Sequence, residues 1–193
     1  MVLYQIILGY SATLLALISF VPYFRDIFRG KTKPHVFTWF VWGLLTGTAF
    51  FVQISEGAGI GAWVTGIESL GCFAITVLAL WHGEKNITRV DWVCFVAALG
   101  GIVLWKLTDN PLLAIILIAL VDILAFIPTF RKAYYKPQEE TVSQFSLSAM
   151  KWVLGIAALE SFALTIWLYP AVLVFLDSSL VIMLLVRRKQ LAK

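Results

Sequence analysis

The sequence predicts an all-α membrane protein of seven transmembrane helices, arranged as two parallel three-helix bundles joined by a linker helix. Three observations support this: an apolar composition, seven apolar runs of helix length, and a repeat in the two halves of the chain. Hydrophobic residues make up 61% of the 193 positions and charged residues only 13%. A soluble domain is about half apolar and a quarter charged. A bilayer accommodates the excess of apolar surface, provided that each segment satisfies its own backbone hydrogen bonds.

Seven apolar runs are of helix length, since a spanning helix needs about 20 residues. They cover residues 3–24, 36–54, 60–81, 90–107, 111–130, 142–162 and 168–185. Glycine, proline and an Asp-Asn pair separate the runs, as is typical of turns and first-turn positions. The sixth and seventh runs are almost continuous, so Pro170 sets the expected start of the last helix.

The cations lie almost entirely on one side of the predicted membrane. When the loops alternate between two sides, one side holds only Lys106. The other side holds Arg25, Arg29, Lys31, Lys33, Lys85, Arg89, Arg131, Lys132, Lys136, Arg187, Arg188, Lys189 and Lys193. Because cytoplasmic loops carry an excess of Lys and Arg, we expect a multi-pass protein of the cell membrane with its N-terminus outside and its C-terminus in the cytoplasm. The basic residues form no separate domain, so nucleic acid is not an expected partner.

The two halves of the chain share a repeat. At a shift of 106 residues, the segment 20–25 (FVPYFR) aligns with 126–131 (FIPTFR), and each ends a predicted helix on the basic side. The third helices align at a shift of 109 residues, which places Glu68 over Asp177. A changed connection between the second and third helices of the unit accounts for the difference.

Two tandem units of three helices would face opposite ways unless an extra helix lay between them. We therefore expect units at residues 1–86 and 110–193, joined by a linker helix at 87–109. This plan of three helices, a linker helix and three more helices resembles the SWEET and PQ-loop superfamily. The resemblance also includes Pro22-Tyr23-Phe24, Pro128-Thr129-Phe130 and the basic loop that follows each. That superfamily includes sugar uniporters, cystinosin-type amino acid exporters and, more distantly, the KDEL receptors. Neither proline is followed by the glutamine that names the PQ-loop.

The resemblance implies a solute pocket between the two units, hinges at Pro22 and Pro128, and alternating access. A plain helix terminus is the other interpretation of each proline. In sugar-transporting SWEETs, the positions that correspond to Glu68 and Asp177 are typically asparagines that bind sugar hydroxyls. Both positions are acidic in this chain, which puts a sugar substrate in doubt.

Four ionisable side chains lie near the middle of predicted membrane helices, where such groups are costly and are candidate functional groups. They are Glu68, Asp122, Lys151 and Asp177. Glu68 and Asp177 are predicted to bind solute or to couple protons, unless one of them only neutralises Lys151. Asp122 is either a proton relay or the partner of Lys151. Glu160, at the outer end of the sixth helix, is expected to face an outer vestibule.

The tryptophans fall into two groups. Those near predicted helix ends are expected to anchor the protein at the membrane interface, and they are Trp63, Trp81, Trp92, Trp105 and Trp167. Trp39, Trp42 and Trp152 lie on the second helix of their units. Trp39 and Trp42 are three residues apart and share a helix face. These three either stack on a solute or pack between helices.

These features predict an alternating-access transporter of a small polar solute. The acids favour proton coupling and a cationic or zwitterionic solute. A SWEET-like sugar uniporter and a non-transporting receptor similar to the KDEL receptors are the alternatives. The sequence has no Walker loop, HExxH, GxSxG or His-rich cluster, so no enzyme, cofactor or metal site is expected. The expected partners are the solute and the lipid bilayer, and the oligomeric state is left open, a homo-oligomer included.

Overall fold

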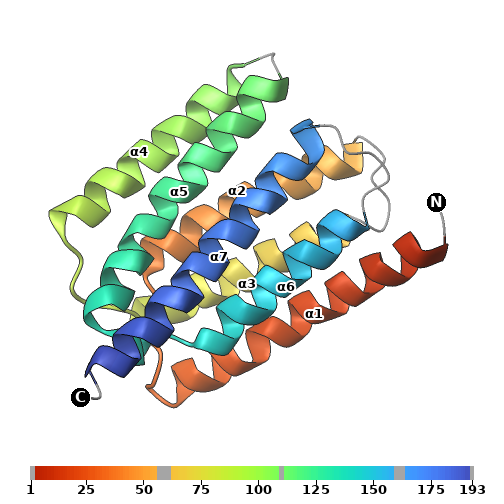
Figure 1. The fold of residues 1–193 in the computed structure, drawn as a ribbon. Helices are drawn as coiled ribbons and strands as arrows, with labels where there is room; N and C mark the ends of the chain where they lie inside the picture. Colours follow the sequence, from red (N-terminus) through yellow and green to blue (C-terminus); the bar gives the residue numbers. More distant parts are fainter. Residues whose placement is uncertain (1–2, 56–61, 109–110, 159–163, 192–193) are drawn as a thin grey trace.

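The computed structural model describes residues 3–55, 62–108, 111–158 and 164–191. Within them the chain forms seven α-helices and one short 3-10 helix, and these residues contain no strand (Figure 1). The elements are α1 (Leu3–Phe28), α2 (Val36–Ser55), α3 (Ala62–His82), α4 (Arg89–Lys106), α5 (Pro111–Tyr135), η2 (Pro137–Glu139), α6 (Val142–Ala157) and α7 (Leu164–Leu191). The all-helical fold with seven helices is therefore confirmed.

The helices run side by side, and the two termini lie at opposite ends of the bundle (Figure 1). Three stretches in the described residues are long and apolar enough to cross a membrane, judged by length and composition: Leu3–Phe28, Trp63–His82 and Trp167–Leu191. A shorter apolar stretch, Val36–Phe51, lies in α2. The other expected spans stay predictions.

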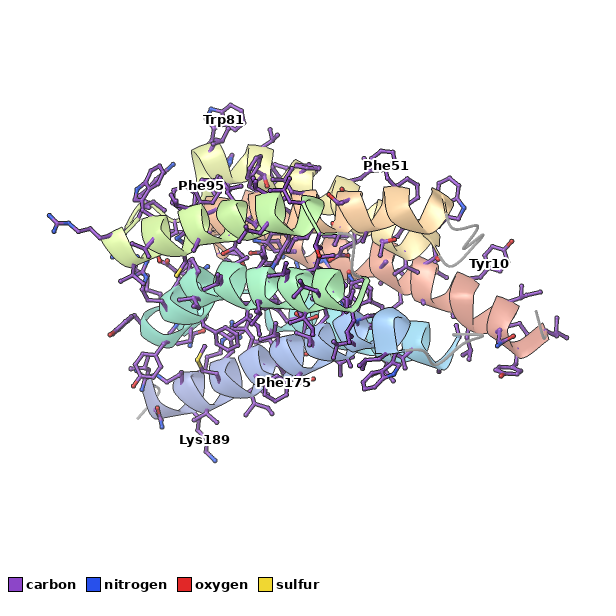
Figure 2. The ribbon with its side chains drawn as sticks, turned by 90° about the horizontal axis from the view of Figure 1, so that it is seen from above. Tyr10, Phe51, Trp81, Phe95, Phe175 and Lys189 are labelled. Carbon is purple, nitrogen blue, oxygen red and sulfur yellow. The ribbon has the colours of Figure 1, made fainter. Side chains whose placement is uncertain are left out.

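Apolar side chains cover much of the outside of the bundle, whereas several charged side chains in the middle of the helices lie inside it. On α1 the exposed face carries Leu3, Ile7, Leu14 and Val21, each at least half exposed. Figure 2 shows Tyr10, Phe51, Trp81 and Phe175 projecting away from the helices. The buried charged side chains in the middle of the helices are Glu68, Asp122, Lys151 and Asp177. This distribution is the reverse of the usual one in soluble proteins, where charged residues are almost never fully buried unless paired.

Each group of three helices shares one packing pattern. Helix α3 contacts α1 and α2, and α7 contacts α5 and α6. Between the groups, α1 contacts α6 and α2 contacts α5. Helix α4 packs against α5 and, less extensively, against α2.

Two glycines on one face of α2 allow α3 to approach closely. A Cβ atom at Gly43 would lie 2.9 Å from the Phe73 ring, and one at Gly47 would lie 2.8 Å from the Ser69 hydroxyl. The Ser69 hydroxyl also donates a hydrogen bond to the Gly43 carbonyl at 2.9 Å. Small residues of this kind let helix backbones approach each other closely.

Helices α1 and α5 continue through their prolines, so the expected ends at residues 24 and 130 are wrong. Pro22 and Pro128 lie inside helices that end at Phe28 and Tyr135. The interpretation of each proline as a plain helix terminus is also wrong. A proline removes one backbone hydrogen bond, but the turns beyond it remain packed, since Ile27 is fully buried.

The boundary between the last two helices also differs from the expected one. Helix α7 begins at Leu164, so Pro170 lies inside it and does not mark its first turn. Helix α6 ends at Ala157, five residues earlier than expected, where the Ala158 N–H bonds to the Leu154 carbonyl at 3.0 Å. Tyr169, the residue directly before Pro170, is buried. Glu160 lies outside the described residues.

Candidate functional site

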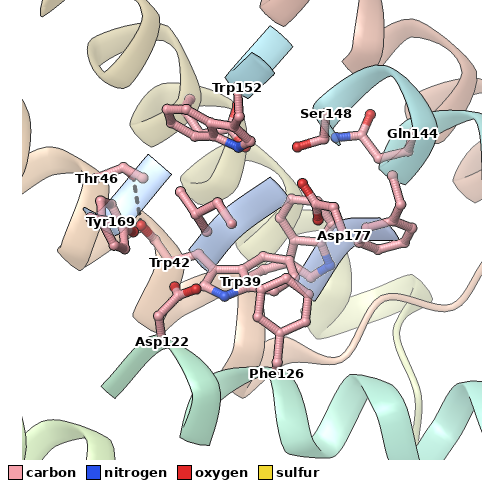
Figure 3. Close-up of a pocket in the computed structure, with 13 residues that line it drawn as sticks. Trp39, Trp42, Thr46, Asp122, Phe126, Gln144, Ser148, Trp152, Tyr169 and Asp177 are labelled. Carbon is pink, nitrogen blue, oxygen red and sulfur yellow. Dashed lines mark hydrogen bonds between the residues drawn. The ribbon is translucent and has the colours of Figure 1, made fainter. Parts of the chain in front are cut away.

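A small cavity lies among α2, α3, α5, α6 and α7, with a volume of about 20 Å³. Its aromatic lining consists of Trp39, Trp42, Phe126, Phe145, Trp152 and Tyr169. Its polar lining consists of Thr46, Glu68, Asp122, Gln144, Ser148 and Asp177 (Figure 3). A cavity of this size holds about one water molecule. A group larger than a water molecule does not fit this cavity as it stands.

The only buried cation near the cavity in the described residues is Lys151, and it pairs with Glu68. The Lys151 ammonium donates a hydrogen bond to the Glu68 carboxylate, and Lys151 is fully buried. The ammonium also lies 4.9 Å from the centre of the Trp152 ring and 5.8 Å from that of Phe20. The expectation that Lys151 is paired is confirmed. The alternative in which Asp122 is its partner is wrong, because α3 rather than α5 brings a carboxylate to the ammonium.

Asp122 is fully buried on α5, and neither of its carboxylate oxygens has a hydrogen-bond partner of standard geometry in the described part of the chain. The Tyr169 hydroxyl lies close enough to interact with this carboxylate. That hydroxyl also lacks a hydrogen bond of standard geometry. An unpaired buried carboxylate costs several kcal/mol, so the site favours anything that brings a proton or a positive charge to it.

Asp177 is buried on α7 and faces Ser148 of α6 across one end of the cavity (Figure 3). Its carboxylate interacts with the Ser148 hydroxyl and, at longer range, with Lys151. The structure thus places Glu68, Asp122 and Asp177 around one space, and in the described part of the chain the one buried lysine beside these acids is Lys151, which pairs with Glu68. Their roles in binding solute or coupling protons stay predictions.

Two further polar atoms at the cavity lack partners among the described residues: Trp42 Nε1 and Gln144 Oε1. Buried polar atoms without partners are few in native proteins, and ordered water or a ligand usually satisfies them. Sequence analysis missed Gln144 and Tyr169, because a glutamine and a tyrosine within an apolar helix carry no distinctive pattern.

The tryptophans differ in burial where the structure describes their side chains, and their expected roles stay predictions. Trp39, Trp42 and Trp152 are buried and line the cavity. The rings of Trp39 and Trp42 also pack edge to face with centroids 5.0 Å apart, so packing and lining are not exclusive. Trp63 and Trp81 are more than half exposed near the ends of α3.

A polar network closes the bundle at the end where α1 and α5 end and α2 and α6 begin, which we call the basic end. The Trp39 indole donates to the Tyr23 hydroxyl at 3.1 Å, and that hydroxyl donates to the Glu140 carboxylate at 3.1 Å. Glu140 also forms a buried ion pair with Lys132. We call Tyr23, Trp39, Lys132 and Glu140 the basic-end clasp. Since Trp39 also lines the cavity, one chain of hydrogen bonds links the cavity to the basic end.

The residues that directly follow the repeated segments 20–25 and 126–131 bind to the other half of the chain at this end. Asp26 of α1 accepts a hydrogen bond from the Thr141 hydroxyl at 3.1 Å. Lys132, which the repeat aligns with Asp26, donates to the Lys33 carbonyl at 2.5 Å. The sequence indicated only a topological role for Lys132, because nothing local distinguishes a buried lysine in a basic loop.

A second ion-pair cluster at the basic end holds α4 against α5. Arg131 donates two hydrogen bonds to Asp91, at 2.9 and 2.6 Å. His35 is fully buried, with its Nε2 atom 3.5 Å from Asp91. Burial lowers the pKa of His35 from 6.5 to about 4, although the Asp91 carboxylate acts in the opposite direction.

The cavity combines acids, unpaired polar atoms and aromatic faces inside a bundle whose exterior is apolar. Such a site can bind a small polar or charged group away from bulk water. Comparison of the chain with protein-family models, with curated proteins and with solved structures finds no match.

Proposed function

We propose that this protein is a seven-span carrier of the cell membrane that moves a small polar solute by alternating access. Its two moving parts are the units 1–86 and 110–193, joined by the linker helix 87–109. The observation that carries the proposal is the acid-lined, aromatic cavity enclosed between these halves. The carrier would belong among transporters of the SWEET and PQ-loop type that the sequence resembles.

The surface of the bundle supports the membrane setting. Its outward face is apolar along α1 and on many exposed positions of the other helices, and the charged side chains that the structure describes are inside or at the basic end. In water an apolar surface of this extent would drive aggregation. In a lipid bilayer the same surface is favourable, because it contacts apolar lipid tails.

The contacts support two equivalent units. When α1, α2 and α3 are exchanged for α5, α6 and α7, the contacts among these six helices map onto one another: α1 with α3 onto α5 with α7, α2 with α3 onto α6 with α7, and α1 with α6 onto α5 with α2.

The cavity lining follows the same exchange. Three positions of α2 and the positions 106 residues later on α6 all line the cavity: Trp39 with Phe145, Trp42 with Ser148, and Thr46 with Trp152. Glu68 and Asp177 line it as a fourth pair, offset by 109 residues. A pocket built from equivalent positions is what rocking of two like units requires.

Movement is supported by the prolines. On α5, Pro128 lies between the cavity residue Asp122 and the clasp residue Lys132. On α1, Pro22 lies between Phe20, which contacts Lys151, and the clasp residue Tyr23. A bend at either proline therefore changes the position of the clasp relative to the cavity.

The charges favour a proton-coupled or cationic solute over the alternatives. A sugar carries no positive charge to balance the acids, and two of the acidic lining positions lie on equivalent helices. A receptor for a peptide carboxylate needs cations in its pocket, whereas the lysine at this cavity is already paired with Glu68.

The experiment is solute uptake by purified protein in liposomes, for a panel of amines, amino acids and sugars, with and without a pH gradient. We expect uptake of at least one basic or zwitterionic solute, and loss of uptake in the Glu68→Gln/Asp177→Asn double variant. Glu139→Gln, outside the cavity, is the matched control. Unchanged uptake in the double variant would exclude the proposed role of the acids, and absence of uptake for every solute together with capture of a protein ligand would favour a receptor.

A further inference from the structure

The buried ammonium of Lys151 shows what kind of environment this cavity offers a cation. One carboxylate, Glu68, forms the ion pair, and the rings of Trp152 and Phe20 lie 4.9 and 5.8 Å from the ammonium. A carboxylate with aromatic faces stabilises a desolvated ammonium by charge and by the ring quadrupoles.

The environment of Asp122 contains the same components. Trp42, Phe126 and Tyr169 line the cavity together with Asp122, and the rings of Trp42 and Phe126 pack with centroids 4.4 Å apart. Figure 3 shows Asp122 beneath the Trp42 ring and beside Phe126, on the opposite side of the cavity from Trp152 and Ser148. In the described residues no basic side chain forms an ion pair with Asp122, its two oxygens lack a hydrogen bond of standard geometry, and the Tyr169 hydroxyl lies nearby.

We infer that Asp122, with the rings of Trp42 and Phe126 and the Tyr169 hydroxyl, is a binding site for the ammonium group of an amine solute. The inference deepens the proposed function, on which the transport of that amine rests, but binding can be tested without transport. A positively charged ligand offsets the cost of the buried carboxylate, and the aromatic faces supply the remaining contacts.

The other charges at the cavity favour a simple amine over an amino acid. The carboxylate of a zwitterion would need a cation, and Lys151 is already held by Glu68. It would also lie close to Glu68 and Asp177, which repel it. Gln144 Oε1 is a hydrogen-bond acceptor that has no partner among the described residues, so it suits a second donor on the solute, such as a hydroxyl or another amine.

Binding of amine probes to the purified full-length protein tests this site. The probes are methylammonium and ethanolamine, with methanol and ethylene glycol as neutral counterparts and NaCl as the ionic-strength control. Tryptophan fluorescence and the thermal midpoint report binding, since ligand binding to the folded state raises its stability. We expect saturable binding of the amines, no binding of the neutral counterparts, and affinity about tenfold or more weaker in Asp122→Asn, because a charged contact is lost.

Control variants separate this site from other causes. Glu139→Gln, at the basic end, should bind the amines as the unmodified protein does. Circular dichroism and gel filtration of Asp122→Asn exclude misfolding as the cause of a loss. Equal binding of amines and neutral counterparts, or undiminished binding in Asp122→Asn, would overturn the inference.

Two outcomes distinguish the inference from the carrier proposal. In the first, the protein takes up a neutral solute with protons, this uptake requires Asp122, and no amine binds. Asp122 would then carry the proton, so the inference would be overturned while the transport proposal stands. Amine binding that depends on Asp122, without uptake of any solute in liposomes, would support the inference and reject the carrier.

Discussion

Lys151 of α6 and Glu68 of α3 form a buried, hydrogen-bonded ion pair, although 83 residues separate them along the chain. The pair connects the two groups of three helices directly beside the cavity. It fixes the Glu68 carboxylate on Lys151, so Asp122 has no ion-pair partner among the described side chains and has the Tyr169 hydroxyl as a polar neighbour.

Breaking this pair on one side should strongly destabilise the protein. Glu68→Gln or Lys151→Met alone leaves one buried group uncompensated, so we expect each to lower the free energy of unfolding by about 3–5 kcal/mol. The double variant should lose much less than the sum. Denaturant unfolding in detergent, analysed as a double-mutant cycle, measures the coupling. Additive losses would mean that the pair is not formed in solution.

Replacement of Asp122 by an apolar residue of similar shape should stabilise the protein while abolishing its function. Asp122→Leu removes an unpaired buried carboxylate, so we expect a gain of about 1–3 kcal/mol in the free energy of unfolding. The same variant should lose amine binding and solute uptake. Asp177→Leu is the comparison, because the Asp177 carboxylate has Ser148 and Lys151 as neighbours. We expect this variant to have a lower free energy of unfolding than Asp122→Leu. Destabilisation by Asp122→Leu would indicate that a bound partner already satisfies Asp122.

Disruption of the basic-end clasp should open the cavity toward the basic side. A Ser148→Cys reporter, in a Cys72→Ser/Cys94→Ser background, places a thiol at the cavity. We expect Glu140→Ala to accelerate its modification by an impermeant maleimide added from the basic side, because Lys132 and Tyr23 lose their common partner. Modification from the other side should not accelerate. Equal acceleration from both sides would indicate general loosening of the bundle.

The hinge role of Pro128 can be separated from its effect on stability. Pro128→Ala restores a backbone hydrogen bond within α5, and we expect stability to be kept or raised. Solute uptake should fall while amine binding persists, because the clasp would no longer move independently of Asp122. Uptake equal to that of the unmodified protein would reject the hinge.

Stability should decrease in mild acid because of His35. The folded-state pKa is lowered to about 4 by burial, so below pH 6.5 the unfolded chain binds a proton that the folded protein does not. The free energy of unfolding should therefore fall from about pH 6.5 down to about 4, by at most roughly 3 kcal/mol. His35→Gln should reduce this slope, whereas His82→Gln should not, since His82 is exposed. Thermal unfolding across this pH range measures both.

Local sequence patterns determined the helical class and the approximate positions of the helices. Helix formation and outward apolarity follow from residues a few positions apart, so hydropathy and periodicity predicted them. The same reasoning identified Glu68, Asp122, Lys151 and Asp177 as groups that would not face an apolar exterior. It misplaced helix ends at Pro22, Pro128 and Pro170, because packing of the following turns outweighs the loss of a single hydrogen bond.

Only the tertiary structure decided which charges meet. The choice of Glu68 over Asp122 as the partner of Lys151 depends on how α3, α5 and α6 pack, and no local pattern encodes a contact between residues 83 positions apart. The same holds for Lys132, whose surroundings in the sequence are those of an exposed lysine but whose ammonium is buried on Glu140. Burial of a charge is a property of the assembled bundle, because it is the neighbouring helices that exclude water and supply the counter-charge.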